Sequence, residues 1–225
     1  MPTKHQVVFD EKEILAAERS KITESHANAQ TAIDFALKLF LLVVAIVTFL
    51  HSVAFERGFH PDWSISRYMG VAPWSAIVFA IVNIGIVVAV LRFAIDMKKT
   101  QKLSKIWFAL ILLMVASFLS LSFCPVGLFD TEWGNYGTVS MIHRYSSYVL
   151  FASMFGLVVD SLIEYKHKSA FFKIYAVLLI IYAILACIGY LLEPPFYMNY
   201  IYFYEAAYIV ANLIFHIICS RQKAD

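Results

Sequence analysis

The chain has 225 residues, of which 61% are apolar and 15% are charged, and its formal net charge is +2. Soluble domains are about half apolar, so this composition, with a mean hydropathy of +0.72, excludes a soluble globular protein. The small net charge identifies no partner by itself, and no nucleic-acid partner is expected. We therefore predict an all-α integral membrane protein.

Residues 1–34 are predicted to be a cytoplasmic tail. They contain six acidic side chains together with four lysines and arginines, a charge density that cannot enter a bilayer and does not fit a secretory signal peptide. The run from Asp10 to Ala27 has good helix formers and an apolar stripe at Ile14, Leu15 and Ile22. This pattern predicts a short surface helix within the tail.

Six apolar segments follow the tail, and each is close to the 20 residues that a helix needs to cross a bilayer. They cover residues 35–55, 74–96, 105–123, 139–163, 171–192 and 197–219. Long continuous apolar runs favour helices over barrel strands, whose hydrophobicity alternates. The sequence therefore predicts one six-helix bundle over residues 35–219, followed by a C-terminal tail at 220–225.

The distribution of lysine and arginine predicts the orientation of this bundle. Basic residues concentrate before the first segment, between the second and third, between the fourth and fifth, and after the sixth. The opposite connections hold only Arg57 and Arg67. Because basic residues favour the cytoplasmic side, both termini are expected in the cytoplasm.

In this orientation, several polar side chains lie in the outer half of the spans. Glu205 is expected about 12 Å beneath the outer end of the sixth helix, at 1.5 Å per residue. Intramembrane ionisable residues often mark functional sites, so we predict an outer polar recess that engages a lipid headgroup or a small ligand. Its candidate residues are His51, Arg67, His143, Arg144, Ser147, Tyr204, Glu205 and Tyr208. The alternative is an internal bridge from Glu205 to Arg144 or His143 that only fixes helix packing.

Four tyrosines also recur in and before the sixth helix. Tyr197, Tyr200, Tyr204 and Tyr208 are three or four residues apart, so the sequence predicts that they share one helix face. They either line a wet cavity or continue an interfacial aromatic belt.

Catalytic motifs are not evident in the sequence. It contains no paired metal-ligand spacing, no Gly-rich phosphate loop, no nucleophile elbow and no His-x-x-x-His. No catalytic residue, metal or cofactor is therefore predicted. Two alternatives remain: a metal held by His51, His143 and either Glu205 or Asp130, and a haem held between His51 and His143.

A short motif precedes the second span. Ile65, Ser66, Gly70 and Pro73 fit the pattern IS-x-x-G-x-x-P with one extra residue before the glycine, while His143 and Glu205 occupy matching positions in later spans. In these features the chain resembles the Frag/DRAM/Sfk group of six-helix membrane proteins, and equally a related prokaryotic group of uncharacterised membrane proteins. The long charged N-terminal tail departs from that pattern.

The resemblance implies a role in lipid organisation, autophagy or signalling, with no catalytic residue to transfer. It implies the plasma membrane or an endolysosomal membrane in a eukaryote and the inner membrane in a bacterium. We therefore expect a non-enzymatic protein that binds a lipid or small ligand or modulates a membrane-protein partner. The alternative is a membrane-embedded, metal-dependent lipid hydrolase that uses His143 and Glu205.

Overall fold

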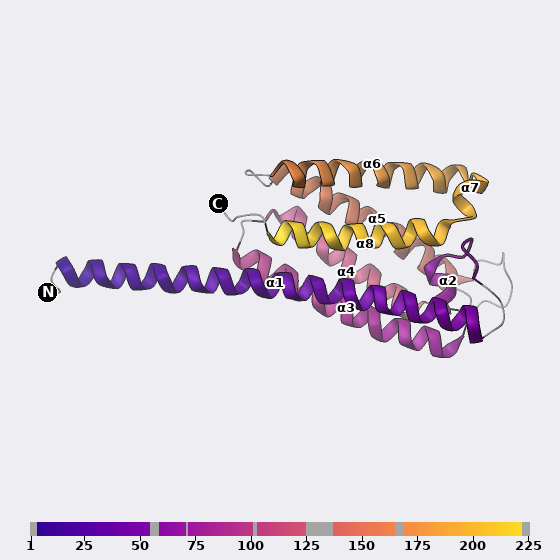
Figure 1. Cartoon of the computed structure of the whole chain (residues 1–225), viewed down its shortest axis with the longest axis horizontal. Helices are drawn as coiled ribbons and strands as arrows, with labels where there is room; N and C mark the ends of the chain where they lie inside the picture. Colours follow the sequence, from indigo (N-terminus) through magenta and orange to yellow (C-terminus); the bar gives the residue numbers. More distant parts are fainter. Residues whose placement is uncertain are drawn as a thin grey trace.

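The computed structural model describes residues 4–54, 59–70, 72–100, 103–124, 137–164 and 169–221. All regular structure in these ranges is helical (Figure 1). The helices are α1 (Lys4–Ala54), α2 (Ile65–Gly70), α3 (Pro73–Thr100), α4 (Lys105–Phe123), α5 (Thr138–Glu164), α6 (Ala170–Leu192), α7 (Pro195–Met198) and α8 (Ile201–Ser220).

Six of these helices are long and apolar enough to cross a membrane, namely α1, α3, α4, α5, α6 and α8. They pack together into one bundle, which confirms the predicted all-α, six-helix fold. Many large apolar side chains point out of the bundle, including Ile81, Val88 and Leu185. Because lipid is as apolar as these side chains, such an exterior is expected of a multi-pass membrane protein.

The first span and the predicted tail form a single helix. No glycine or proline occurs between Pro2 and Gly58, so nothing in the sequence interrupts α1 once its apolar part is helical. Its burial begins at Ala29 and continues through Ile33 and Phe40. The N-terminal part extends past the other helices (Figure 1). The short surface helix that we expected in the tail is therefore one part of a 51-residue helix.

The core of the bundle lies where α1, α3, α4 and α5 pack in succession, with α8 against both α1 and α6. Phe93 of α3 and Trp107 of α4 are fully buried within it, and their ring centroids are 6.0 Å apart. Helix α6 lies at one edge of the bundle in Figure 1. Its peripheral position leaves most of its apolar surface exposed.

The two ends of the bundle differ in chemistry. At the end that we call the basic end, buried Asp96 accepts hydrogen bonds from Arg92 Nε at 2.7 Å and Lys99 Nζ at 3.1 Å. Here the carbonyl of Ser220 on α8 also lies 3.2 Å from Nδ1 of His26 on α1. The opposite end carries α2 and α7, and we call it the α2 end. The predicted orientation places the basic end in the cytoplasm.

The sixth span begins later than predicted. Pro194 and Pro195 start the separate short helix α7, and Asn199 follows it as the C-cap. Tyr197 therefore lies on α7, and Tyr200 is the N-cap of α8 rather than a residue within it. The predicted single-helix tyrosine face is wrong for these two, because the proline pair changes the chain direction before α8 starts.

Helix α2 occupies the IS-x-x-x-G motif and forms a cap on its end of the bundle. The Ser64 hydroxyl accepts a hydrogen bond from the Arg67 backbone N at 3.1 Å, as an N-cap side chain does. The Tyr68 hydroxyl donates to the His60 carbonyl at 2.9 Å. These local bonds hold residues 60–68 together ahead of α3.

Candidate functional site

A groove of about 580 Å³ opens at the α2 end between α5, α6 and α8. Ligand pockets commonly have volumes of about 300 to 1,000 Å³. The groove is lined by Tyr148, Phe151, Ala152, Phe155, Ala183, Ile184, Ala186, Cys187, Tyr190, Leu191, Tyr197, Tyr204, Glu205 and Tyr208. Ile184 and Leu191 are exposed on its α6 side. The groove therefore opens toward the lipid-facing surface of that helix.

Glu205 is the charged residue of this lining. Its Oε2 atom accepts a hydrogen bond from the backbone N of Ile65, the first residue of α2, at 2.9 Å. Within the described ranges, no ion pair involves Glu205. A carboxylate can accept several hydrogen bonds, and this one receives one from the backbone. Burying its remaining lone pairs in an apolar wall costs free energy unless another donor binds there.

Tyrosine rings line the groove together with this carboxylate. The Tyr197 and Tyr204 rings stack with centroids 4.7 Å apart, although they come from different helices. The Tyr182 hydroxyl on α6 donates to the Tyr204 carbonyl at 2.9 Å and so ties α6 to α8. Burial, with a smaller contribution from the charge of Glu205, raises the pKa of the Tyr197 hydroxyl to about 12. Tyrosine faces and a carboxylate together form an environment suited to a cation.

Arg144 lies at the rim of the groove. Its Nε atom donates to the Tyr148 hydroxyl, and its guanidinium carbon is 5.7 Å from the centroid of that ring. The Tyr148 hydroxyl donates in turn to the Tyr190 hydroxyl at 3.2 Å. Arg144 is itself exposed. A positive charge therefore lies beside the groove mouth and is connected to two of the lining tyrosines.

His143 is positioned by a different pair of helices. It is buried on α5, and its Nδ1 atom lies 2.6 Å from the carbonyl of Cys124 at the end of α4. The Ser147 hydroxyl donates back to the His143 carbonyl at 3.0 Å. Neither residue lines the groove. His143 and Glu205 therefore do not contact each other in these hydrogen bonds: His143 contacts Cys124, whereas Glu205 contacts Ile65.

The other predicted residues are distributed as follows. Tyr204, Glu205 and Tyr208 line the groove. Arg67 stacks on Trp63, with its guanidinium carbon 4.0 Å from the ring centroid. The side chain of His51 lies outside the described part of the chain, as does Asp130. Among the described residues, no group of three or more His, Cys, Asp or Glu side chains is placed to hold a metal ion.

Sequence reasoning missed the α6 wall of the groove and its partners on α5. Tyr148, Tyr190 and Cys187 were not singled out, although Tyr148 is one turn after Arg144. That spacing was the one available signal, since residues four apart share a helix face. Small and apolar lining residues such as Ala183 look identical to lipid-facing positions in sequence.

Comparison with known protein families, curated proteins and solved structures found no match for this chain. The fold and the groove define a multi-pass membrane protein with six candidate spans. The resemblance in the α2 motif stays a prediction.

Proposed function

We propose that this protein is a non-enzymatic membrane protein that binds a lipid-like amphiphile in the groove between α5, α6 and α8. The observation that carries the proposal is Glu205, a carboxylate on the wall of a groove that is otherwise apolar and aromatic. An apolar chain matches the α5 and α6 walls, while a polar head matches Glu205 and the tyrosines beside it.

The chemistry of the groove favours a head group that carries an amine. A carboxylate only accepts hydrogen bonds, and the stacked Tyr197 and Tyr204 rings offer faces that attract cations. Arg144 at the rim suits a phosphate, which guanidinium binds well. These features together support a zwitterionic phospholipid with an amine head as the ligand class.

The hydrolase alternative requires His143 and Glu205 to act on one substrate. His143 instead lies against Cys124, outside the groove lining, so we do not propose it. The resemblance to the Frag/DRAM/Sfk group agrees with a lipid-related role. By that resemblance, we propose the plasma membrane or an endolysosomal membrane in a eukaryote, or the inner membrane in a bacterium, with a membrane-protein partner as a second mode of action.

Native mass spectrometry tests the proposal. The purified protein is titrated with phosphatidylethanolamine and phosphatidylglycerol that have the same acyl chains. Glu205→Gln removes the charge but keeps an oxygen that can accept from Ile65 N. We expect this variant to lose the preference for phosphatidylethanolamine that the native protein shows. The matched control is Glu193→Gln, which changes an exposed carboxylate outside the groove lining.

A second pair of variants tests the position of the ligand. Ala152→Trp places a large ring in the groove, whereas Ala207→Trp places it on an exposed part of α8 outside the lining. Lipid adducts should decrease only for Ala152→Trp. Equal lipid binding by Glu205→Gln, Ala152→Trp and the native protein would refute the proposed function.

A further inference from the structure

The lipid-facing side of α3 carries a positive charge among apolar side chains. Ile84, Val88 and Ile95 are exposed on this side, and exposed Arg92 lies between Val88 and Ile95 in the chain. These four residues are three or four positions apart, so they share one face of the helix. Arg92 is therefore part of the surface that meets lipid, with an apolar side chain one turn before it and another one turn after it.

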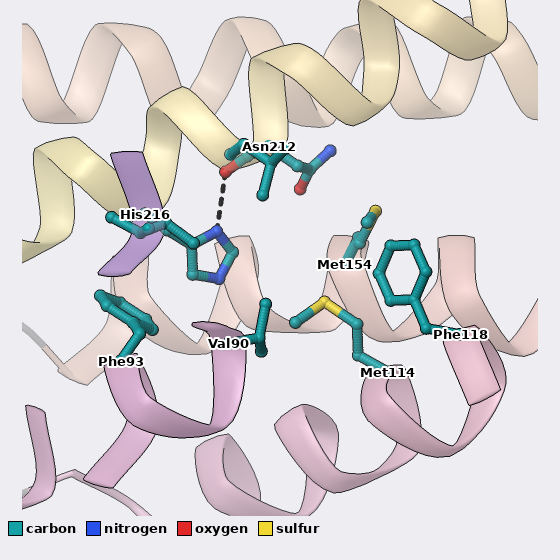
Figure 2. Close-up of a pocket in the computed structure, with 9 residues that line it drawn as sticks. Val90, Phe93, Met114, Phe118, Met154, Asn212 and His216 are labelled. Carbon is teal, nitrogen blue, oxygen red and sulfur yellow. Dashed lines mark hydrogen bonds between the residues drawn. The ribbon is translucent and has the colours of Figure 1, made fainter. Parts of the chain in front are cut away.

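The rotation of α3 is set by the packing of its other face. Val90 and Phe93 are buried there and line a small internal cavity with Asn212 and His216 of α8 (Figure 2). The Phe93 and His216 rings pack edge to face, with their centroids 5.5 Å apart. Because Phe93 is held inside the bundle, Arg92 is left on the outer face of the helix.

Two cations share one buried carboxylate on this helix. Asp96 accepts a hydrogen bond from Arg92 Nε on Oδ2 at 2.7 Å and another from Lys99 Nζ on Oδ1 at 3.1 Å. The side chains of both cations are 56% exposed, whereas that of Asp96 is 1% exposed. Two positive groups against one carboxylate leave an excess of positive charge, and that excess is on the exposed side.

The Arg92 guanidinium keeps donors for a ligand. Its Nε atom is bonded to Asp96, and neither Nη atom has a hydrogen bond within the described ranges. Hydrocarbon supplies no acceptor for these N–H groups. Basic side chains near helix ends therefore extend toward the headgroups, where acceptors are present. A lipid phosphate is the acceptor that this position meets.

Lys98 adds a positive charge on the α4 side of the same helix end. Its Nζ atom lies 5.1 Å from the centroid of the Phe108 ring on α4. In the part of the chain that the structure describes, Lys98 has no ion pair. We call Arg92, Asp96, Lys98 and Lys99 together the α3 basic patch. It has three cations and one carboxylate.

We propose that the α3 basic patch binds the phosphate of an anionic phospholipid. Guanidinium N–H groups of Arg92 bind the phosphate oxygens, and Lys98 and Lys99 attract the negative charge. The excess positive charge favours a lipid with an uncharged head, such as phosphatidylglycerol, over one whose amine would lie beside the lysines. The patch is at the basic end of the bundle, whereas the groove opens at the α2 end, so this site does not depend on the groove.

Photo-crosslinking of the full chain in phosphatidylcholine nanodiscs tests this inference. Each sample also contains a small fraction of phosphatidylglycerol or phosphatidylethanolamine, with identical acyl chains and a diazirine close to the glycerol. Peptide mass spectrometry then locates the labelled residues. We expect phosphatidylglycerol to label residues 88–99 roughly fivefold more than phosphatidylethanolamine, because one basic side chain near the surface contributes about that factor. Equal labelling by the two lipids would overturn the proposal.

Two variants remove the excess charge in different ways. Lys99→Gln leaves the Arg92–Asp96 pair, and Arg92→Gln leaves the Lys99–Asp96 pair, so buried Asp96 keeps a cationic partner in each. Both should lose the preference for phosphatidylglycerol on α3. The matched control is Lys38→Gln on α1, which removes an exposed cation that is paired with Asp34 at 2.6 Å. An equal loss in this control would show a general effect of charge and contradict the site.

A soluble anion is the competing ligand, because inorganic phosphate presents the same oxygens. Labelling by phosphatidylglycerol is therefore compared in sodium phosphate and in sodium chloride of the same ionic strength. Equal labelling in the two salts supports a lipid ligand. Selective suppression by phosphate would assign the patch to a soluble anion and overturn the lipid assignment.

One further variant separates this site from the groove. Ala152→Trp obstructs the groove at the other end of the bundle and should leave labelling of α3 unchanged. Loss of labelling in this variant would show that the lipid reaches α3 only through the groove, which contradicts an independent site. A failure of the proposed groove function leaves the α3 result unaffected.

Discussion

Replacing Gly189 by alanine tests how tightly α7 packs on α6. Gly189 is buried, and a Cβ atom there would lie 2.6 Å from Cδ2 of Tyr197 and 2.9 Å from Cε2 and Cγ of the same ring. These distances are well below the 3.5 to 4.0 Å of a favourable carbon contact. Because Cγ lies on the Cβ–Cγ axis, turning the Tyr197 ring about that bond does not relieve the overlap. Tyr197 must move, and its stack on Tyr204 at 4.7 Å is then disturbed.

The matched control is Gly85→Ala on α3. There the added Cβ meets only Cδ2 of Leu39, at 2.8 Å, which is the end of a flexible side chain. Both substitutions gain about 1 kcal/mol of helix propensity, so this gain cancels when the variants are compared. The remaining difference is the overpacking cost of about 1 to 3 kcal/mol. For a chain of this size it corresponds to roughly 2 to 12 °C in melting temperature.

The assay is a thermal melt of both variants in one detergent, followed by intrinsic fluorescence. We expect Gly189→Ala to melt below the native protein and Gly85→Ala to melt at or above it. A Gly189→Ala melting temperature equal to or higher than that of Gly85→Ala would refute the packing of Tyr197 on α6.

Three further predictions concern the helix caps, alkaline pH and topology. Ser104→Ala should destabilise more than Ser169→Ala in the same melt. Both variants lose an N-cap worth about 1 kcal/mol. The single hydroxyl hydrogen of Ser104 is also shared between the two carboxylate oxygens of buried Asp160, with Oγ at 3.1 and 3.0 Å from them, and losing this bond adds about 1 to 3 kcal/mol. Between pH 10 and about 12 an unfolded tyrosine ionises while folded Tyr197 keeps its proton, so stability should fall as pH rises through this window, and Tyr197→Phe should reduce the fall measured by chemical denaturation. Single cysteines at Asn199 and Ser169 in a cysteine-free chain should react with an impermeant thiol reagent from opposite sides of the membrane; labelling from one side would contradict the six-span topology.

The architecture could be predicted from sequence because a bilayer imposes simple length and composition rules on its helices. For five of the six predicted spans, most helix ends lie within about two residues of the observed ends. The first observed helix is longer than its predicted span because nothing in the sequence interrupts α1. The starts of α4 and α6 are also indicated locally, because the N-cap residues Ser104 and Ser169 each precede an apolar run. These features depend on local sequence alone.

The candidate site required more than local sequence. The spans that carry His143 and Glu205 were readable from sequence, but the predicted depth of Glu205 was too great, because α8 begins at Ile201 and Glu205 is only four residues further on. The direction in which each side chain points around the bundle was not readable, because helix rotation is set by packing against neighbours. His143 turned toward the end of α4, and Glu205 toward α2. The partner of Glu205 is the backbone N–H of Ile65. Every residue except proline carries this group, so the sequence cannot indicate which one donates.

The length, number and apolar character of the spans were thus determined by the sequence itself, because lipid requires each helix to satisfy its own backbone and to expose an apolar surface. Which apolar side chains face lipid and which enclose a cavity was decided only by the tertiary structure. Ala183 and Cys187 became groove walls, and Asn212 and His216 came to share a small cavity, through the packing of α8 among its neighbours. Packing has this role because burial in a membrane bundle depends on helix rotation, and the six spans are too uniformly apolar for composition to specify it.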